Sequence, residues 1–432
     1  MCGYVGFTNR IENADAVLGE MMDTIRHRGP DSEGKYIDDG IALGFRRLSI
    51  IDLEGGRQPM YNEDENLVVV FNGEIYNYQQ LREKLVAAGH VFKTHSDSEV
   101  LLHGYEEYGV KLLNMLRGMF SFVIWDKEKQ ELFGARDYFG IKPLYYAEMN
   151  GTLLFGSEIK AFLPHPQFEK KLNLSTLENY LTFQYSPLSD TFFEGVKKLM
   201  PAHYFLYKDE KMEITRYWEP NFENDESKSL EDWVGEIRKT FEGSVEAHKI
   251  SDVEVGSFLS SGIDSSYVAA CAKVDKTFTV GFAGDKYDEI GYAKRCSDYI
   301  GIKNSSKAIT EQEYWDIIPT VLYHLDEPLG DPASIALYFV SREAAKNVKV
   351  ALSGEGADEV FGGYNVYSET IRSARYCKLP KGIRGLIGKT VDHMPPFKAK
   401  NFLYRHRGDL QDWFNGNPNA GFSERERKKI LK

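Results

Sequence analysis

Short apolar runs separated by polar and glycine-rich turns dominate the first 200 residues. Runs of this length that are rich in Val, Ile, Phe and Tyr predict β-strands. The stretch 78–88 instead has helical spacing and is followed by Gly89, which predicts a helix with a glycine cap. Strands interrupted by a few helices indicate layered sheets flanked by helices. We expect strands over 4–7, 41–45, 67–71, 120–125, 131–135 and 153–156.

The pattern changes after residue 230, where strand-like runs alternate with helical stretches. Such alternation predicts a parallel sheet with helices on both faces, which binds ligands at the carboxyl ends of its strands. The expected strands are 254–259, 277–282 and 348–352, and the expected helices are 230–248, 265–271, 288–300, 313–325 and 335–346.

The two patterns divide the 432 residues into two domains. Residues 2–190 form an α+β domain of layered sheets. Residues 191–226 contain prolines, aromatic residues and a charged run, a composition typical of a linker. Residues 227–432 form an α/β domain with a Rossmann-like parallel sheet.

The composition excludes several classes of protein. The chain is 42% hydrophobic and 27% charged, with a net charge of −12 and no long basic run, which argues against a nucleic-acid surface. No apolar run reaches the roughly 18 residues of a membrane span, and the first residues lack the pattern of a signal peptide. We therefore expect no membrane partner and a cytoplasmic location. The four cysteines are scattered and there is no His cluster, so neither a disulfide framework nor a zinc site is expected.

Cys2 follows the initiator methionine, so removal of one residue would place a thiol and a free α-amino group on the same residue. An α-amino group has an unperturbed pKa of about 7.7–8.0. It can therefore accept the thiol proton near neutral pH, as the amine of N-terminal threonine nucleophiles does. A small buried hydrophobe is the alternative for a single cysteine.

Four polar clusters follow the predicted strands and helices, at 26–32, 46–52, 72–74 and 96–99. The first has the composition of a solvated loop. Arginines in the second offer a bidentate fork for a carboxylate. In the third, an Asn amide and a Gly N–H at a strand end form either an oxyanion hole or a simple turn. The fourth supplies either a helix N-cap or a buried anion for an ammonium group.

Together with Cys2, these clusters resemble the class II glutamine amidotransferase domain, an N-terminal-nucleophile hydrolase, over most of residues 2–190. The matching stretches are RHRGPDS, RRLSIID, FNGEIYN, SDSEV, GMFSFVIWD, GARDYFGIKPLYY and GSEIKAFL. The resemblance implies an αββα sandwich in which Cys2 attacks the glutamine amide and a thioester is hydrolysed to glutamate, with release of ammonia. It also implies that Asn72 and the Gly73 N–H hold the oxyanion, that Arg47 binds the α-carboxylate, and that Asp97 with Glu74 binds the α-ammonium group.

Two loops of the second domain carry candidate chemistry. Ser260-Ser-Gly-Ile-Asp-Ser265 joins a strand to a helix, so it predicts an anion nest at a helix N-terminus. Asp264 in such a nest would carry Mg²⁺, although a capped helix start has the same composition. The loop 353–359, SGEGADE, places three acids among glycines after an apolar strand, which predicts a magnesium-tolerant site or a solvated turn.

These loops, with Asp326-Glu-Pro and Asp331-Pro, resemble the PP-loop ATP-pyrophosphatase domain. The two domains together resemble the glutamine-hydrolysing asparagine synthetases, from residue 2 to about 370. The resemblance implies a ligase that uses ATP and Mg²⁺ to convert aspartate to β-aspartyl-AMP and pyrophosphate, after which ammonia from glutamine displaces AMP. Its partners would be glutamine, aspartate and ATP, and a homodimer is compatible with it.

The resemblance assigns further roles by position. Ser260, Ser261, Gly262, Asp264 and Ser265 would bind nucleotide, pyrophosphate and magnesium, with Ser261 standing where the family signature has Gly. We expect that change to be tolerated, although serine reaches positive φ less freely. The remaining assignments are Leu259, Val280, Ser353 and Gly354 at the adenosine, Glu355 as the base or orienting group for ammonia, Asp358 at substrate or metal, and Asp326 and Asp331 as acceptor or metal candidates.

Beyond residue 370 the sequence departs from the family, because an RVPFLD-type motif and a later lysine are missing. We expect an incomplete synthetase domain, with glutaminase chemistry retained and asparagine formation impaired. One alternative is a related enzyme that amidates a sugar acid or peptide carboxylate. Another is a non-catalytic assembly protein, which should lack some of Cys2, Arg47, Asn72 and Asp97; all four are present.

Overall fold

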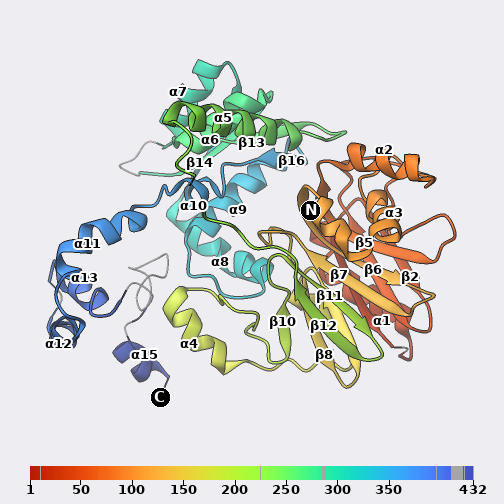
Figure 1. The fold of residues 1–432 in the computed structure, drawn as a ribbon, viewed down its shortest axis with the longest axis horizontal. Helices are drawn as coiled ribbons and strands as arrows, with labels where there is room; N and C mark the ends of the chain where they lie inside the picture. The colour runs from red at the N-terminus through yellow and green to blue at the C-terminus, as the bar shows by residue number, and fades with distance from the viewer. Residues whose placement is uncertain are drawn as a thin grey trace.

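The structure is a computed structural model that describes residues 1–9, 11–223, 225–284, 289–395, 397–409, 422 and 424–431. An N-terminal part built from two stacked sheets lies beside a C-terminal part built around one smaller sheet (Figure 1). Among the described residues, no helix combines the length and apolar character needed to cross a membrane.

Two six-stranded antiparallel sheets form the N-terminal part, in the orders β10-β8-β9-β1-β3-β2 and β12-β11-β7-β6-β5-β4. The strands of the first sheet are β1 (Gly3–Thr8), β2 (Ser32–Ile37), β3 (Ile41–Arg47), β8 (Tyr145–Met149), β9 (Thr152–Gly156) and β10 (Val196–Lys198). Those of the second are β4 (Met60–Tyr61), β5 (Leu67–Ile75), β6 (Gly118–Asp126), β7 (Glu131–Arg136), β11 (His203–Lys208) and β12 (Lys211–Arg216). All six strands expected in the first 200 residues are present.

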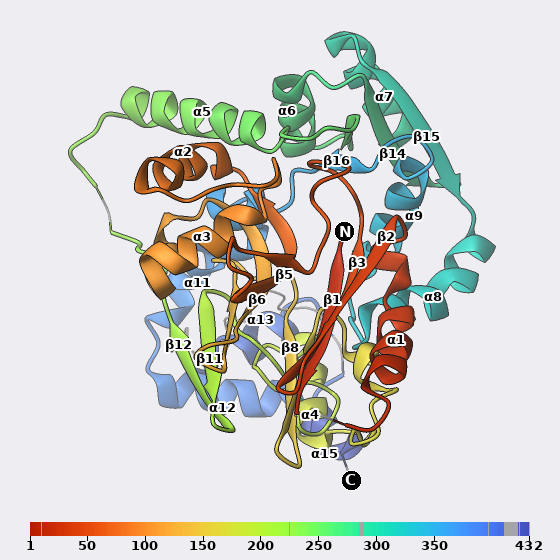
Figure 2. The same cartoon turned by 90° about the vertical axis from the view of Figure 1, so that its right-hand side faces the viewer.

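Helices cover the outer faces of both sheets, on opposite sides of the molecule (Figure 2). α1 (Ala14–Thr24) packs on the first sheet, and α2 (Tyr78–Ala88) and α3 (Glu99–Tyr108) pack on the second. Alternate residues of β5 explain why its sequence is almost wholly apolar. Val68 and Val70 face the first sheet, whereas Val69 and Phe71 face α2 and α3, so both sides of the strand are buried. The expected αββα sandwich is confirmed.

The prediction that residues 191–226 form a linker is wrong for 196–216. These residues form β10, β11 and β12, which extend the two sheets of the sandwich. Phe205 on β11 is fully buried opposite Gly134 of β7, where a Cβ would lie 2.2 Å from its ring. The aromatic run on β11 therefore belongs to the sandwich core.

A four-stranded parallel sheet in the order β15-β14-β13-β16 forms the centre of the C-terminal part, as expected for an α/β domain. The strand order reverses at β13, which has β14 on one side and β16 on the other. β15 was not expected, because its sequence KNSSKAI is polar, as an edge strand can be. The strands are β13 (Val255–Phe258), β14 (Lys276–Phe282), β15 (Lys303–Ile309) and β16 (Val350–Leu352).

Helices cover both faces of this sheet. One face packs against α5 (Leu230–Ala247), α6 (Ile263–Ala272) and α7 (Glu289–Ile300), and the other against α8 (Glu311–Leu325) and α9 (Ala333–Ala344). The later helices α11, α12 and α13 lie on the side of this part that is remote from α2 and α3 (Figure 1). The other helices are α4 (Leu174–Phe183), α10 (Ala357–Phe361), α11 (Glu369–Cys377), α12 (Lys381–Asp392), α13 (Lys400–Arg405) and α15 (Glu424–Ile430), with 3₁₀ turns at Arg26–Arg28, Gly109–Met115, Ile159–Phe162 and Asn365–Ser368.

Candidate active sites

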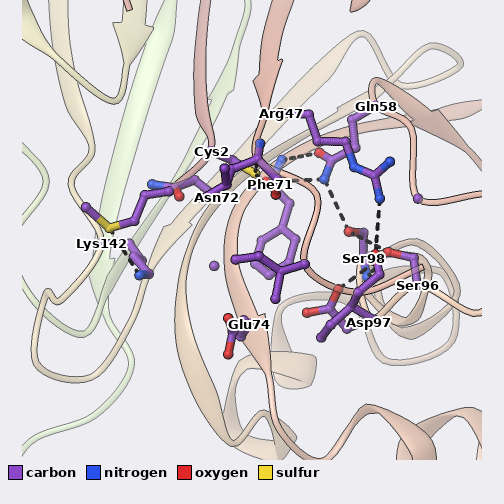
Figure 3. Close-up of a pocket in the computed structure, with 16 residues that line it drawn as sticks. Cys2, Arg47, Gln58, Phe71, Asn72, Glu74, Ser96, Asp97, Ser98 and Lys142 are labelled. Carbon is purple, nitrogen blue, oxygen red and sulfur yellow. Dashed lines mark hydrogen bonds between the residues drawn. The ribbon is translucent and has the colours of Figure 1, made fainter. Parts of the chain in front are cut away.

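A cavity of about 70 Å³ lies at the N-terminus of the chain (Figure 3). Its walls come from the two residues before β1, from β3, β5, the loop that follows β3, the segment before α3, and Lys142 before β8. The N-terminus lies close to β16 in both views, so the cavity is on the side of the sandwich that faces the parallel sheet (Figures 1 and 2). The cavity brings together all six residues that the sequence assigned to glutamine chemistry, namely Cys2, Arg47, Asn72, Gly73, Glu74 and Asp97.

The Cys2 thiol is held by the backbone of Leu48. The Leu48 N–H donates to Sγ at 3.4 Å, and Sγ lies 3.5 Å from the Leu48 carbonyl oxygen. Burial raises the pKa of the Cys2 thiol, so the thiol needs a base to become nucleophilic. Burial also lowers the pKa of the Met1 α-amino group to about 5. The Met1 amine is therefore unprotonated at neutral pH.

Asn72 and Gly73 lie inside β5 rather than at its end, because the strand continues to Ile75. This corrects the prediction of a strand end. The Asn72 side chain is 1% exposed, and its amide nitrogen is buried without a hydrogen-bond partner. A buried N–H group without a partner is rare and is what an oxyanion hole requires. At Gly73 a Cβ would lie 2.2 Å from the Met119 carbonyl oxygen, so only glycine fits.

Neighbouring arginines on β3 point in opposite directions, as successive residues of a strand do. Arg46 pairs with Asp23 and Glu33 on the outer side. Arg47 lines the cavity, where its guanidinium donates to the carbonyl oxygen of Asp52 at 2.6 Å. Arg47 is therefore the arginine placed to bind an anionic group in the cavity.

Two carboxyl groups, those of Asp97 and Glu74, also line the cavity. Asp97 is buried and accepts a hydrogen bond from the Ile75 N–H at 2.9 Å. Burial raises the pKa of Asp97 to about 6, and burial together with the Asp97 charge raises the pKa of Glu74. α3 begins at Glu99 without a side-chain cap, so the alternative of an N-cap for this cluster is not seen. Two carboxyl groups in one buried wall favour the binding of a cation.

Lys142 and Gln58 also line the cavity, although no role was predicted for either of them. The Lys142 ammonium lies 3.4 Å from the sulfur of Met1, and burial lowers its pKa. Gln58 accepts from the Phe71 N–H at 2.6 Å and donates to the Ser98 hydroxyl at 3.2 Å, so it joins β5 to the start of α3. Lys142 falls within the stretch GIKPLYY, which is the only sequence signal for it.

The loop after β3 is held from the C-terminal part. Ile50 lines the cavity, and its carbonyl oxygen accepts the Asp252 N–H at 2.9 Å. The Asp252 carboxylate in turn accepts the Asp52 N–H at 2.7 Å. The cavity wall thus includes a loop that is bonded to both parts of the chain.

The predicted nucleotide loop 260–265 is held by hydrogen bonds between its own backbone and hydroxyl groups. The Ser260 N–H donates to the Ser265 hydroxyl at 3.1 Å, and the two hydroxyls lie 2.8 Å apart. α6 begins directly after Gly262, so the loop is a helix N-terminus as expected. Ser261 is not among the residues with positive φ, so serine at this position requires no strained backbone.

The second predicted loop packs against the first. A Cβ added to Gly354 would lie 2.9 Å from the Ser265 nitrogen and 3.0 Å from Cβ of Asp264. Because β13 and β16 are neighbours, both loops lie at the carboxyl ends of adjacent strands, where the strand order reverses. This is the usual ligand position in a sheet of this kind.

The other predicted nucleotide-site residues surround these loops. Leu259 is buried below the loop, and its carbonyl oxygen accepts from the Thr279 hydroxyl. Val280 lies half-buried on β14, and the Ser353 hydroxyl accepts the Glu355 N–H at 3.1 Å. Glu355 is exposed and Asp358 is half-buried in the first turn of α10, so both carboxylates can reach a ligand from solvent.

Asp326 and Asp331, which the sequence marks as acceptor or metal candidates, also have structural partners within the chain. The Asp326 carboxylate accepts the Ile159 N–H at 2.6 Å and lies 2.7 Å from the Lys160 ammonium. Asp331 accepts the Ala333 N–H at 2.9 Å at the start of α9. Asp326 therefore joins the two parts of the chain, and Asp331 supports a helix terminus.

The fold and the two sites define a glutamine amidotransferase domain joined to an α/β domain of the kind that binds ATP. Residues 1–218 match the glutamine amidotransferase domain family, and residues 236–427 match the asparagine synthase family. The chain is 43% identical to the glutamine-hydrolysing asparagine synthetase 1 of Bacillus subtilis, over the whole chain and 70% of that protein. The chain belongs to the glutamine-hydrolysing asparagine synthetases, a family of ligases.

Two further proteins are similar to this chain. Asparagine synthetase 3 of Bacillus subtilis is 35% identical over 84% of this chain and 63% of that protein. Among solved structures, the glutamine phosphoribosylpyrophosphate amidotransferase of B. subtilis has a TM-score of 0.39 at 18% identity, covering 71% of this chain and 65% of that chain. The family assignment rests on the sequence relatives.

Proposed function

We propose that this chain takes the amide nitrogen of glutamine and transfers it to aspartate at the expense of ATP, giving asparagine, glutamate, AMP and pyrophosphate. The observation that carries the glutaminase half is the buried Asn72 amide, which has no partner and lies in the same cavity as the Cys2 thiol. Family membership supports the synthetase half.

The first reaction begins once the residue before Cys2 has been removed. The Cys2 α-amino group takes the thiol proton, and Sγ attacks the amide carbon of glutamine. The oxygen becomes an oxyanion, which the Asn72 amide and the Gly73 N–H stabilise. The C–N bond breaks as the leaving nitrogen receives a proton, ammonia departs, and water hydrolyses the thioester to glutamate.

Charged groups at the two ends of the cavity orient the substrate. Arg47 would bind the α-carboxylate of glutamine through its planar guanidinium. Asp97, with Glu74, would bind the α-ammonium group on the opposite wall. A ligand that carries both charges fits this arrangement, whereas a simple amide lacks both contacts.

The second reaction takes place at the two loops of the parallel sheet. Ser260, Ser261, Gly262 and Ser265 would hold the phosphates of ATP at the N-terminus of α6. Leu259, Val280, Ser353 and Gly354 would surround the adenosine, and Glu355 would orient the attacking ammonia.

The residues at the loops fit Mg²⁺, because hydroxyl and carboxylate oxygens are the ligands that this ion prefers. Asp264 and Asp358 would hold it. When bound, Mg²⁺ neutralises phosphate charge and makes pyrophosphate a better leaving group. The packing of Gly354 against Asp264 supports this assignment, since it brings the second loop against the residue expected to carry the metal.

We also propose that the domain boundary falls between β12 and α5, and that the enzyme works in the cytoplasm, where glutamine, aspartate and ATP are present together.

A homodimer without nucleic-acid or membrane partners is the assembly we propose. Light scattering of the purified chain measures this directly, and a monomeric mass at micromolar concentration would contradict it.

Mass spectrometry of the purified N-terminus after treatment with an electrophilic glutamine analogue tests the glutaminase step. We expect a chain without Met1 that carries one adduct on Cys2. Glutamate release and ATP-dependent asparagine formation, measured in the same sample, then test the two halves separately. Glutamate release without asparagine formation would retain the first half of the proposal, overturn the second, and favour the sequence-based alternative of a chain with impaired asparagine formation.

A further inference from the structure

A cluster of histidine and glutamate side chains lies on the outer face of the second sheet, away from both sites. Glu63 precedes β5, His90 follows α2, and His103 and Glu106 are one turn apart on α3. One ligand atom from each of the four lies within 4.8 Å of all the others. We propose that these four residues bind a divalent transition-metal ion, with zinc as the best match to the ligand set.

The distances between the donor atoms match a tetrahedral metal site. Four ligands at about 2.0–2.2 Å from a zinc ion lie roughly 3.4 Å from one another in a tetrahedron. In the structure, His103 Nδ1 is 3.3 Å from Glu63 and 3.5 Å from Glu106. His90 Nδ1 is 3.6 Å from Oε2 of Glu106 and 3.9 Å from Oε1 of Glu63. The four donors therefore surround a space of the right size for the ion.

Carboxylates on the outer side of both histidines complete the arrangement. His103 Nε2 lies 3.5 Å from the Glu99 carboxylate, and His90 Nε2 lies 3.3 Å from that of Glu107. Metal-bound histidines almost always direct their second nitrogen to a carboxylate, carbonyl or water, which fixes the ring and its tautomer. Each Nδ1 is thereby left as the ligand atom that faces the cluster.

His103 supplies the second, independent observation. Its ring is fully buried, and neither ring nitrogen has a partner in hydrogen-bond geometry, although carboxylate oxygens lie 3.3–3.5 Å from both. A buried imidazole with two unsatisfied nitrogens is costly unless another partner occupies the space. The competing arrangement is an imidazolium surrounded by carboxylates, and those groups do raise the pKa of His103 against the lowering effect of burial.

The two glutamates keep an oxygen for the metal while their other oxygen is fixed by the protein. Glu63 Oε1 accepts the Val91 N–H at 2.8 Å, and Glu106 Oε1 accepts from the Asn62 amide at 3.2 Å. In each case Oε2 is the atom closest to His103. The side chain of Glu106 is partly exposed, so the ion can enter from solvent.

Metal titration of the purified full-length chain tests the proposal. The chain is first treated with a chelator and exchanged into fresh buffer. One equivalent of Zn²⁺ is then added, and bound zinc is measured by elemental mass spectrometry. We expect about one zinc per chain and a rise in the melting temperature. Co²⁺ in place of zinc should give the strong visible absorption of a tetrahedral N/O site, without the sulfur charge-transfer band that coordination by Cys2 would produce.

Substitutions at the rim of the cluster keep the test independent of folding. His90→Gln and Glu106→Gln each remove one ligand from a partly exposed position, and we expect at least a tenfold loss of zinc affinity. The exposed histidine variant His393→Gln is the control and should bind as the parent chain does. Equal zinc binding by all variants, or no zinc-dependent change in the parent chain, would overturn the proposal in favour of the imidazolium arrangement.

Discussion

The Lys160 ammonium lies 2.7 Å from the Asp326 carboxylate, and both side chains are only 5% exposed. The pair joins the sandwich to the segment after α8. Glu158 also contacts Lys160, so the cation lies between two carboxylates. Because these charges are buried at the junction of the two parts, each needs its counter-charge to offset the cost of leaving water.

Removing the carboxylate of this pair should loosen the junction. We expect Asp326→Ala to lower the free energy of unfolding by roughly 3 kcal/mol, because a buried cation then loses one of its counter-charges. Denaturant unfolding of the parent and variant chains measures this. Lys171→Ala, which removes an exposed pair with Glu194, is the control and should leave the transition unchanged. Equal effects of the two substitutions would contradict the interpretation.

Replacing the nucleophile should separate the two reactions. We expect Cys2→Ala to abolish glutamate release, while asparagine formation from added ammonia proceeds at the rate of the parent chain. The reason is that Cys2 contacts the sandwich cavity and none of the loops of the parallel sheet. Coupled assays with glutamine and with ammonium chloride measure the two activities. Residual glutamate release at the parent rate would exclude Cys2 as the nucleophile.

The buried amide of Asn72 should act mainly on the transition state. We expect Asn72→Ala to lower kcat for glutamine by about 10²–10³, with a much smaller change in KM, since one oxyanion donor is lost. Steady-state kinetics of glutamate release distinguishes the two constants. A rise in KM at unchanged kcat would instead make Asn72 a ground-state binding residue.

Glutamine use should fall in mild acid. Burial raises the pKa of Asp97 to about 6, so the carboxylate is protonated as the pH falls through this value and loses its attraction for the substrate ammonium. We expect kcat/KM for glutamine to be full above about pH 7 and to decline below pH 6. Asp97→Asn should have low activity and lack this step in its pH profile. A parent profile flat between pH 5 and 7 would contradict this role.

The contact between the two nucleotide loops offers a selective test of ATP use. We expect Gly354→Ala to raise KM for ATP at least tenfold, because the new methyl group would lie 2.9 Å from the backbone nitrogen of Ser265. Glutamate release should be unaffected. The matched control is Gly385→Ala, where nothing lies within 4 Å of the added Cβ. ATP-dependent pyrophosphate release measures both variants, and parent-like ATP kinetics for Gly354→Ala would contradict the proposed site.

Sequence patterns predicted those parts of the structure that local chemistry determines. The helix over 78–88 is confirmed with Gly89 at φ +109°, because a left-handed cap depends on the residue type itself. The five side chains assigned to glutamine chemistry, together with Gly73, were placed in one site through family motifs. Their arrangement in one cavity is a consequence of the sandwich, which brings β1, β3 and β5 together.

The failures have two physical causes, which are pairing between distant segments and the polar sequence of an edge strand. β11 was taken as linker because its partner β7 is remote in the sequence, and β15 is polar because it is an edge strand. The cluster of Glu63, His90, His103 and Glu106 was missed because its members come from three separate segments. No local spacing rule detects such a set.

The loop from Leu48 to Asp52 has a consequence for the timing of the overall reaction. It touches the Cys2 sulfur at one end and is bonded to Asp252 of the other half at its far end. A shift of Asp252 when the second half binds its substrates would therefore displace the loop that contacts the Cys2 thiol. Ammonia would then be released only when an activated acid is present, so that little of it is lost to solution as ammonium.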